Sequence, residues 1–201
     1  MATGRYVDSL WGAGDNPAMA EPMHSPRVKL ICGMISGRVE LFDEAARALE
    51  GVFGPVDVAS EVLDFDFTHY YDGEMGSPLY RRLVGFERLV GPEELVEVKL
   101  ATNALECDFA SRAGAGSAPR PINLDPGYVD SAKLVLASMK DFSHRIYLGR
   151  GVFAEVTLMF RKGFWEKLPW TFPDYGSGRY DSFLTAARRR LREQPAAEGR
   201  S

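Results

Sequence analysis

One short, almost uninterrupted apolar stretch constrains the fold of this 201-residue chain more than any other feature. Residues 28–35 read Val-Lys-Leu-Ile-Cys-Gly-Met-Ile, with a single charged residue among them. An apolar run of this length without alternation is typical of a strand that is covered on both faces. The stretch therefore predicts the central strand of a sheet with other layers of structure on both sides.

The next segments predict a helix and a second strand. Ser36 is the expected N-cap, and apolar residues then recur at three- and four-residue steps as far as Phe53, before Gly54. Apolar and polar residues alternate over 56–63, which predicts a strand that leads to Asp64. Strand, helix and strand in this order indicate a sheet with a helix packed on it.

Proline and glycine mark the boundaries of the middle segments. Pro78 suits a first helical position and predicts a helix over 78–90, and Pro92 predicts another helix as far as Phe109. Asp125-Pro126-Gly127-Tyr128 has the pattern of a type II turn, which predicts a sharp reversal of the chain. A helix over 130–140 is expected after this turn.

The last third of the chain predicts a hairpin and a terminal helix. Strands over 144–148 and 152–160 are joined by Gly149-Arg150-Gly151. An aromatic, proline-containing segment over 168–175 is expected to be irregular, and a final helix carries apolar residues from Tyr180 to Leu191. These elements predict an α+β fold with a mixed sheet of about five strands. The helices are expected mainly on one face, with the final helix closing the edge.

The domain organisation follows from the same patterns. We expect a single domain over 27–193, a flexible N-terminal arm over 1–26 and a disordered tail over 194–201. The Gly-, Ser- and Pro-containing segment 111–121 is expected to be a mobile loop.

Composition bears on partners and compartment. The net charge of −4 provides no global attraction to nucleic acid or to anionic lipid. The two cysteines, Cys32 and Cys107, lie in apolar or helical patterns and indicate no disulfide scaffold. Residues 1–26 contain no apolar stretch of signal-peptide length, and no run approaches the ~20 apolar residues of a membrane span, so we expect neither a signal peptide nor a membrane-spanning segment. We therefore expect a cytoplasmic protein that does not bind membranes.

Four blocks of the sequence stand out together. They are residues 28–36, Asn123-Leu124-Asp125-Pro126-Gly127-Tyr128, His144-Arg145-Ile146-Tyr147-Leu148-Gly149 and Leu168-Pro169-Trp170-Thr171-Phe172-Pro173-Asp174-Tyr175. These blocks resemble those of a bacterial family known only as a domain of unknown function, DUF4416. The resemblance extends from about Arg27 to Arg192 and implies a single self-contained bacterial domain, without a known activity.

The densest group of polar residues lies over 64–74. If the second strand extends to Asp66, then Asp64 and Asp66 share one face, and His69 and Glu74 follow in a loop that could fold over it. Two carboxylates suit Mg²⁺ or Mn²⁺, and with an imidazole also Zn²⁺ or Fe²⁺, so a divalent metal is the candidate cofactor. The alternative is an acidic surface loop anchored by aromatic residues.

A second polar group combines Asn123 and Asp125 with His144, Arg145 and Glu155. A three-residue hairpin loop places Glu155 opposite Arg145, and a two-residue loop places it opposite His144. Arg145, with Asn123 and Glu155, is the candidate substrate-binding group. His144, Asp125 and His69 are the candidate catalytic residues for proton transfer. Alternatively, Asp125 bonds to the turn and Arg145 pairs with Glu155 across the strands.

Two further polar surfaces lie on predicted helices. Lys99, Asn103 and Glu106 share one helix face, which is interpreted as a solvated surface. The final helix carries an arginine-rich outer face, made of Arg188, Arg189, Arg190 and Arg192. The leading hypothesis is a small enzyme or nucleotide-handling domain that acts on a phosphorylated or otherwise anionic substrate, with assistance from a metal. The alternative is a noncatalytic module that binds RNA or a protein through the arginine-rich face.

Overall fold

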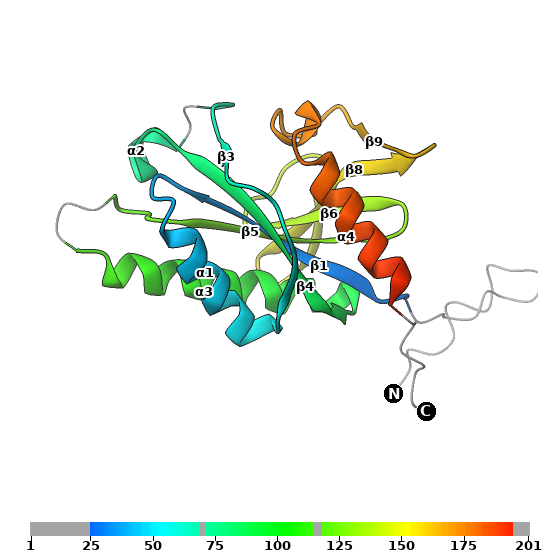
Figure 1. Cartoon of the computed structure of the whole chain (residues 1–201), viewed down its shortest axis with the longest axis horizontal. Coiled ribbons are helices and arrows are strands. Elements are labelled where there is room, and N and C mark those ends of the chain that lie inside the picture. Colours follow the sequence, from blue (N-terminus) through cyan, green and yellow to red (C-terminus); the bar gives the residue numbers. More distant parts are fainter. Residues whose placement is uncertain (1–24, 69–70, 115–117, 195–201) are drawn as a thin grey trace, which may run out of the picture.

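A computed structural model describes residues 25–68, 71–114 and 118–194 (Figure 1). These residues form one nine-stranded sheet, in which seven strands follow the order β2-β4-β1-β5-β6-β8-β7, while β3 pairs with β4 and β9 with β8. Every pair of strands is antiparallel. The α+β class is confirmed. The predicted mixed sheet of about five strands is wrong. Two segments that were predicted as helices, 78–90 and 130–140, form strands, and no parallel pair occurs among the described strands.

The described chain contains nine strands and the helices that cover them. The strands are β1 (Val28–Ser36), β2 (Val56–Ala59), β3 (Leu63–Asp64), β4 (Tyr80–Val90), β5 (Asn123–Val129), β6 (Lys133–Ser138), β7 (Ile146–Gly149), β8 (Val152–Arg161) and β9 (Phe164–Lys167). The helices are α1 (Leu41–Phe53), α2 (Asp72–Met75), α3 (Leu95–Arg112) and α4 (Asp181–Glu193), with 3₁₀ turns η1 (Pro92–Glu94) and η2 (Tyr175–Ser177). None of the helices in the described part is long and apolar enough to span a membrane.

Strand β1 is the buried centre of the sheet. All nine of its residues are buried between β4 and β5, which confirms the strand predicted over 28–35. Its alternate side chains enter two different cores. Leu30 and Met34 pack with residues of α1 and α3, whereas Ile31 packs with residues of α4.

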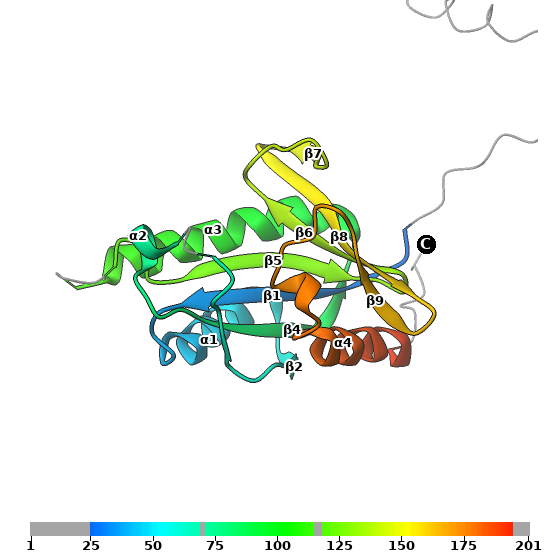
Figure 2. The same cartoon turned by 90° about the horizontal axis from the view of Figure 1, so that it is seen from above.

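The helices cover both faces of the sheet. Figure 1 shows α1 and α3 along the lower side of the sheet, and Figure 2, seen from above, shows α4 on the upper side together with η2. Helix α4 buries Phe183, Leu184 and Ala187 in the second core. The expectation that the final helix closes the edge of the sheet is therefore wrong. Because β1 and its neighbours are apolar on both faces, the second face also needs a cover.

Strand β4 replaces the helix that was predicted over 78–90. It pairs with β1 from Val28–Val90 to Ser36–Tyr80 and with β2 on its other edge. The neighbouring residues Leu83 and Val84 are both buried, in the cores on opposite faces. The spacing of the apolar residues in this segment also fits one face of a helix, and pairing with β1 makes the segment a strand.

Strand β5 runs straight through the predicted type II turn at 125–128. Gly127 lies opposite Leu136 of β6, and a Cβ atom there would be 2.3 Å from the carbonyl oxygen of Val135. Glycine is thus required for close approach of the strands rather than for a turn. The chain reverses after Val129, where Asp130 Oδ1 accepts hydrogen bonds from the amides of Ala132 and Lys133 at 2.6 and 2.8 Å. The predicted helix over 130–140 is therefore strand β6.

The predicted hairpin near the C-terminus is confirmed as β7 and β8, with Arg150 at a φ of 52° in the loop. The segment predicted as a mobile loop over 111–121 begins with the last turn of α3, and residues 115–117 lie outside the described residues. Nearly all of the expected arm over 1–26 and tail over 194–201 also lies outside them.

Candidate functional site

The sheet opens between β5 and β6. These strands pair only from Gly127–Leu136 to Val129–Leu134, and beyond Leu136 strand β6 pairs with β8 alone. A cavity of about 940 Å³ lies at this opening. Its walls come from β5, β6 and α3, and also from the segment around η2 on the opposite face of the sheet. The cavity therefore crosses the plane of the sheet.

Two side chains of α3 complete β5 where β6 has left it. The amide of Leu124 donates to Glu106 Oε1 at 2.7 Å, and the carbonyl of Leu124 accepts from Lys99 Nζ at 3.1 Å. Buried backbone groups require such partners when no strand supplies them. Pro126, two residues further along, points its nitrogen toward the same side. Because β5 and β6 are not paired at Pro126, its missing N–H does not remove a hydrogen bond between these two strands.

Lys99 is a buried cation on the wall of the cavity. It is 5 % exposed, and its contact with Leu124 is the single hydrogen bond of its ammonium group within the described part of the chain. No carboxylate of the described residues lies within 4.0 Å of it. Asn103, one helical turn further along the same wall, makes no hydrogen bond to another described residue. This wall therefore presents uncommitted hydrogen-bond donors to the cavity.

Glu106 and Arg120 form the neighbouring part of the same wall. Arg120 Nη2 donates to Glu106 Oε2 at 2.8 Å and also contacts Asn123 Oδ1. Burial raises the pKa of Glu106 above its ordinary value, although Lys99 and Arg120 act in the opposite direction.

The opposite wall is organised around the buried guanidinium of Arg81. It contacts Asp174, donates to the Tyr175 hydroxyl at 2.9 Å, and lies 3.5 Å from Asp125 Oδ2. Burial by itself would lower the pKa of Arg81, but its neighbours, Asp174 and Asp125 among them, raise the pKa above its ordinary value. Burial raises the pKa of Tyr175, so this hydroxyl stays neutral. The side chain of Arg81 therefore stays charged and holds the η2 segment against the sheet.

A third charged group lies where β8 meets the loop before β7. Arg145 Nε donates to Glu155 Oε2 at 2.7 Å, and His144 Nε2 lies 2.9 Å from the same oxygen. Both sequence-predicted partners of Glu155 are thus present. Arg145 Nη1 also donates to the hydroxyl of Ser138 at 2.9 Å. The ring of His144 stacks on Trp170, with centroids 5.3 Å apart and an interplanar angle of 10°.

Comparison with known proteins assigns a family without an activity. Residues 26–191 match the model of a domain of unknown function, DUF4416. The chain belongs to this family. The match includes every element that lines the cavity, and it confirms the resemblance seen in the sequence blocks. No curated protein and no solved structure shows significant similarity to the chain.

The structure brings together most of the second predicted polar group. Asn123, Asp125, Arg145 and Glu155 all line the cavity. Asn123 Nδ2 donates to Asp125 Oδ2 at 2.8 Å. His144 is not among the lining residues and contacts the group through Glu155. The roles of these residues in substrate binding and proton transfer remain predictions.

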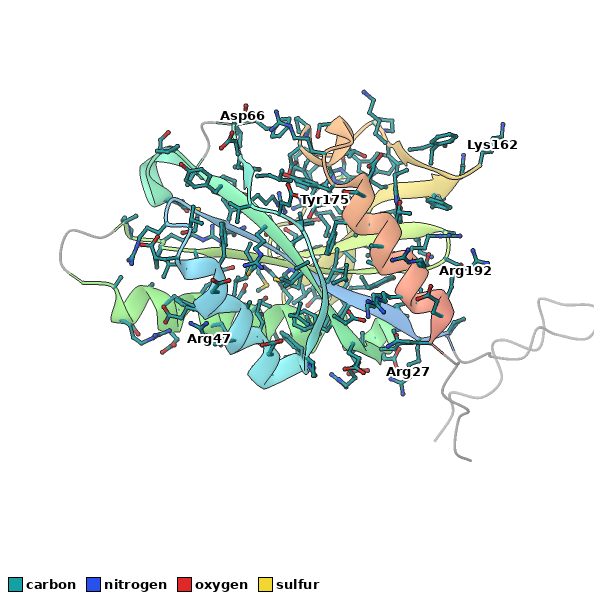
Figure 3. All side chains as sticks on the ribbon, in the orientation of Figure 1. Arg27, Arg47, Asp66, Lys162, Tyr175 and Arg192 are labelled. Atoms are coloured by element: carbon teal, nitrogen blue, oxygen red, sulfur yellow. The ribbon has the colours of Figure 1, made fainter. Side chains whose placement is uncertain are left out.

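The first predicted polar group does not form the expected strand face. Strand β3 ends at Asp64, and Asp66 turns to Arg179 Nη1 at 2.9 Å. Figure 3 shows Asp66 at the periphery, whereas Tyr175 lies among the interior side chains. Neither carboxylate lines the cavity, and His69 lies outside the described residues. The residues described here contain no group of three or more His, Cys, Asp or Glu that could hold a metal ion.

The ridge of Lys99, Asn103 and Glu106 was expected in solvent, and this interpretation is wrong. The three residues face the cavity because α3 packs behind the opening of the sheet. Their shared helix face is visible in the sequence, but their contact with Leu124 is not. Arg81 was likewise missed as a site residue, because the segment 78–90 that contains it was predicted to be a helix.

The arginine-rich face of α4 is partly used within the molecule. Arg188 lies 3.9 Å from the centroid of the Phe160 ring and donates to the Ser131 carbonyl at 2.8 Å. Arg189, Arg190 and Arg192 are exposed, and Figure 3 shows Arg192 on the outer side of the helix.

Proposed function

We propose that the protein binds a small organic anion, a carboxylate or a phosphate, in the cavity at the opening of the sheet, as the substrate of a small enzyme. The observation that carries this proposal is the buried ammonium of Lys99, which has a carbonyl partner but no carboxylate within 4.0 Å among the described residues. A buried charge is costly unless it is paired. A bound anion would supply the missing partner.

Unlike Lys99, the three arginines on the cavity wall already have carboxylate partners. Arg81 pairs with Asp174, Arg120 with Glu106, and Arg145 with Glu155. These ion pairs fix the positions of the side chains on the wall. The anion therefore binds to the donors that have no carboxylate partner. Lys99 and Asn103 are therefore the residues that we assign to the anion, and Arg145 remains a candidate second contact through its Nη2 group.

The rest of the cavity suits an organic molecule. A volume of about 940 Å³ lies in the range of small-molecule sites, which are typically apolar with a few placed polar groups. Aromatic side chains contribute much of the lining, namely Phe65, Phe67, Tyr71, Phe142, Phe172 and Tyr175. The ligand expected from this lining has a flat or apolar part beside its anionic group.

Asp125 is the candidate proton-transfer group of this site. Its side chain is 27 % exposed, and Asn123 and Arg81 hold its Oδ2 atom in place. A carboxylate that is oriented by two donors and still reachable from a cavity can act as a general base. His144 acts in this proposal through Glu155 as a positioning residue, because it is not on the cavity wall.

Matched pairs of charged and neutral probes test the proposal. We expect benzoate and adenosine monophosphate to raise the melting temperature, and benzamide and adenosine to have little effect. The chain offers a second readout, because Cys107 is exposed on the cavity wall whereas Cys32 is buried. A bound probe should slow alkylation of Cys107.

Substitution of the ammonium group identifies the residue responsible. Lys99→Met retains most of the buried aliphatic stem, and we expect it to abolish the effect of both anions. Lys162→Met, in an exposed turn, is the matched control and should leave the effect unchanged. Equal responses to the charged and neutral probes, or full binding of the anions by Lys99→Met, would refute the proposal.

A further inference from the structure

The two walls of the cavity present opposite charge. On the side of α3, Arg120 pairs with Glu106 and also lies 3.6 Å from Glu74, so the uncommitted cation of this wall is Lys99. On the opposite side, two carboxylates, Asp125 and Asp174, hold the single cation Arg81. The first wall therefore offers the positive charge of Lys99, and the lining residues of the second wall have one excess negative charge.

The remaining charged residues of the lining leave this polarity unchanged. Arg145 and Glu155 form a pair and compensate each other. Lys140 and Asp141 are adjacent in sequence, both exposed and opposite in charge. Tyr175 is neutral because burial raises its pKa.

From this polarity we infer that the ligand is a zwitterion of the amino-acid type, with an acidic group that binds Lys99 and Asn103 and an amino group that binds Asp125. This inference rests on the proposed function, to which it adds a second charge on the ligand. A dipolar molecule would place each of its charges against the wall of opposite sign.

Asp125 is the carboxylate that can receive the amino group. Its Oδ2 atom accepts from Asn123 and lies near Arg81, while its Oδ1 atom has no partner among the described residues. Asp174 is less suitable, because its side chain is 5 % exposed and its Oδ2 atom already contacts Arg81 and Tyr180. The open oxygen of Asp125 is thus the negative end of the site.

The two ends of the site lie close enough together for a small ligand. Lys99 is held at the carbonyl of Leu124, and Asp125 is the next residue of the same strand. Consecutive Cα atoms are about 3.8 Å apart, so the two binding groups flank one peptide unit of β5. The opening between β5 and β6 lets one molecule contact groups on both faces of the sheet.

Three forms of one amino acid test the inference. L-Phenylalanine carries both charges, N-acetyl-L-phenylalanine lacks the positive charge, and L-phenylalaninamide lacks the negative charge. We expect L-phenylalanine to bind most tightly, by thermal shift, calorimetry and protection of Cys107. Each modified form should bind at least about tenfold more weakly, since it loses a hydrogen bond between charged groups.

Asp125→Asn should remove the preference for the free amino group over the acetylated one, and the melting temperature without ligand reports whether the variant folds. Asp43→Asn, an exposed carboxylate of α1, is the control and should keep the preference. If the acetylated form binds as tightly as the free amino acid, or if benzoate binds and L-phenylalanine does not, the inference fails while the anion site stands. If the amide binds as tightly as the acid, or if no probe binds, the proposed function fails as well.

Discussion

The ammonium of Lys99 lies 3.1 Å from the carbonyl oxygen of Leu124, so a side chain of α3 occupies the place of a strand at the opening of the sheet. Glu106 binds the amide of the same residue. Both backbone groups of Leu124 therefore have partners where β5 has lost its neighbour β6. The opening that results is the cavity in which we place the ligand.

Removal of the Glu106 carboxylate should weaken this substitute for a strand. Glu106→Ala leaves the Leu124 amide without an acceptor and removes one of the acceptors of Arg120, and we expect the free energy of unfolding to fall by about 1–3 kcal/mol. Hydrogen exchange at the Leu124 amide should accelerate. Asp108→Ala, an exposed carboxylate on the same helix, is the control and should change stability by less than about 0.5 kcal/mol. Unchanged exchange at Leu124 would contradict the assignment.

The raised pKa of Glu106 predicts a dependence of stability on pH. Burial favours the protonated form in the folded protein, so the folded state takes up this proton at a higher pH than the unfolded state. The stabilisation is complete below the ordinary glutamate pKa and is lost as the pH rises through the raised value. Relative to Glu106→Gln, the natural protein should therefore lose stability as the pH rises across this window. Urea unfolding of both proteins at several pH values measures the difference, and a constant or opposite trend would contradict it.

Gly127 should not tolerate a methyl group. Its Cβ atom would lie 2.3 Å from the backbone oxygen of Val135, where no side-chain movement can relieve the clash. We expect Gly127→Ala to lower the free energy of unfolding by at least about 1–3 kcal/mol. Gly51→Ala, in helix α1 with open space around it, should instead stabilise the protein by about 0.5–1 kcal/mol. Chemical denaturation of the two variants compares the effects directly.

The buried carboxylate of Glu155 should be essential for stability because Arg145 depends on it. Glu155 is 1 % and Arg145 11 % exposed in their side chains, so Glu155→Ala leaves a nearly buried cation unpaired. We expect a loss of about 3–5 kcal/mol in the free energy of unfolding. The double variant Arg145→Met with Glu155→Leu should lose less than the single variant. Glu97→Ala, which breaks an exposed ion pair with Arg150, is the control and should cost less than about 1 kcal/mol.

The sequence predicted some elements correctly and others wrongly, and the difference has a physical reason. Strand β1 and the β7–β8 hairpin were predicted correctly because their burial and turn signals are local. Strand β4 was mistaken for a helix because its apolar residues fit either period, and only pairing with β1 separates the two. Pro126 and Gly127 were mistaken for a turn because their local preferences hide the requirement for close strand approach.

The residues of the candidate site were likewise predicted only in part. The sequence grouped Asn123, Asp125, Arg145 and Glu155 with His144, and the first four line the cavity whereas His144 does not. Lys99 and Glu106 were assigned to solvent, since a polar helix face has the same pattern whether it meets water or an open sheet.

By itself, the sequence determined the α+β class, the buried central strand, the presence of the β7–β8 hairpin and of the final helix, and the polar residue types available for a site. Only the tertiary structure decided which apolar segments became strands, where the sheet opens, and which polar residues face the opening. Hydrophobic periodicity and turn chemistry act over a few residues and can be read along the chain. The pairing of β5 with β6 for three residues, and of Leu124 with α3 beyond them, depends on contacts between distant segments.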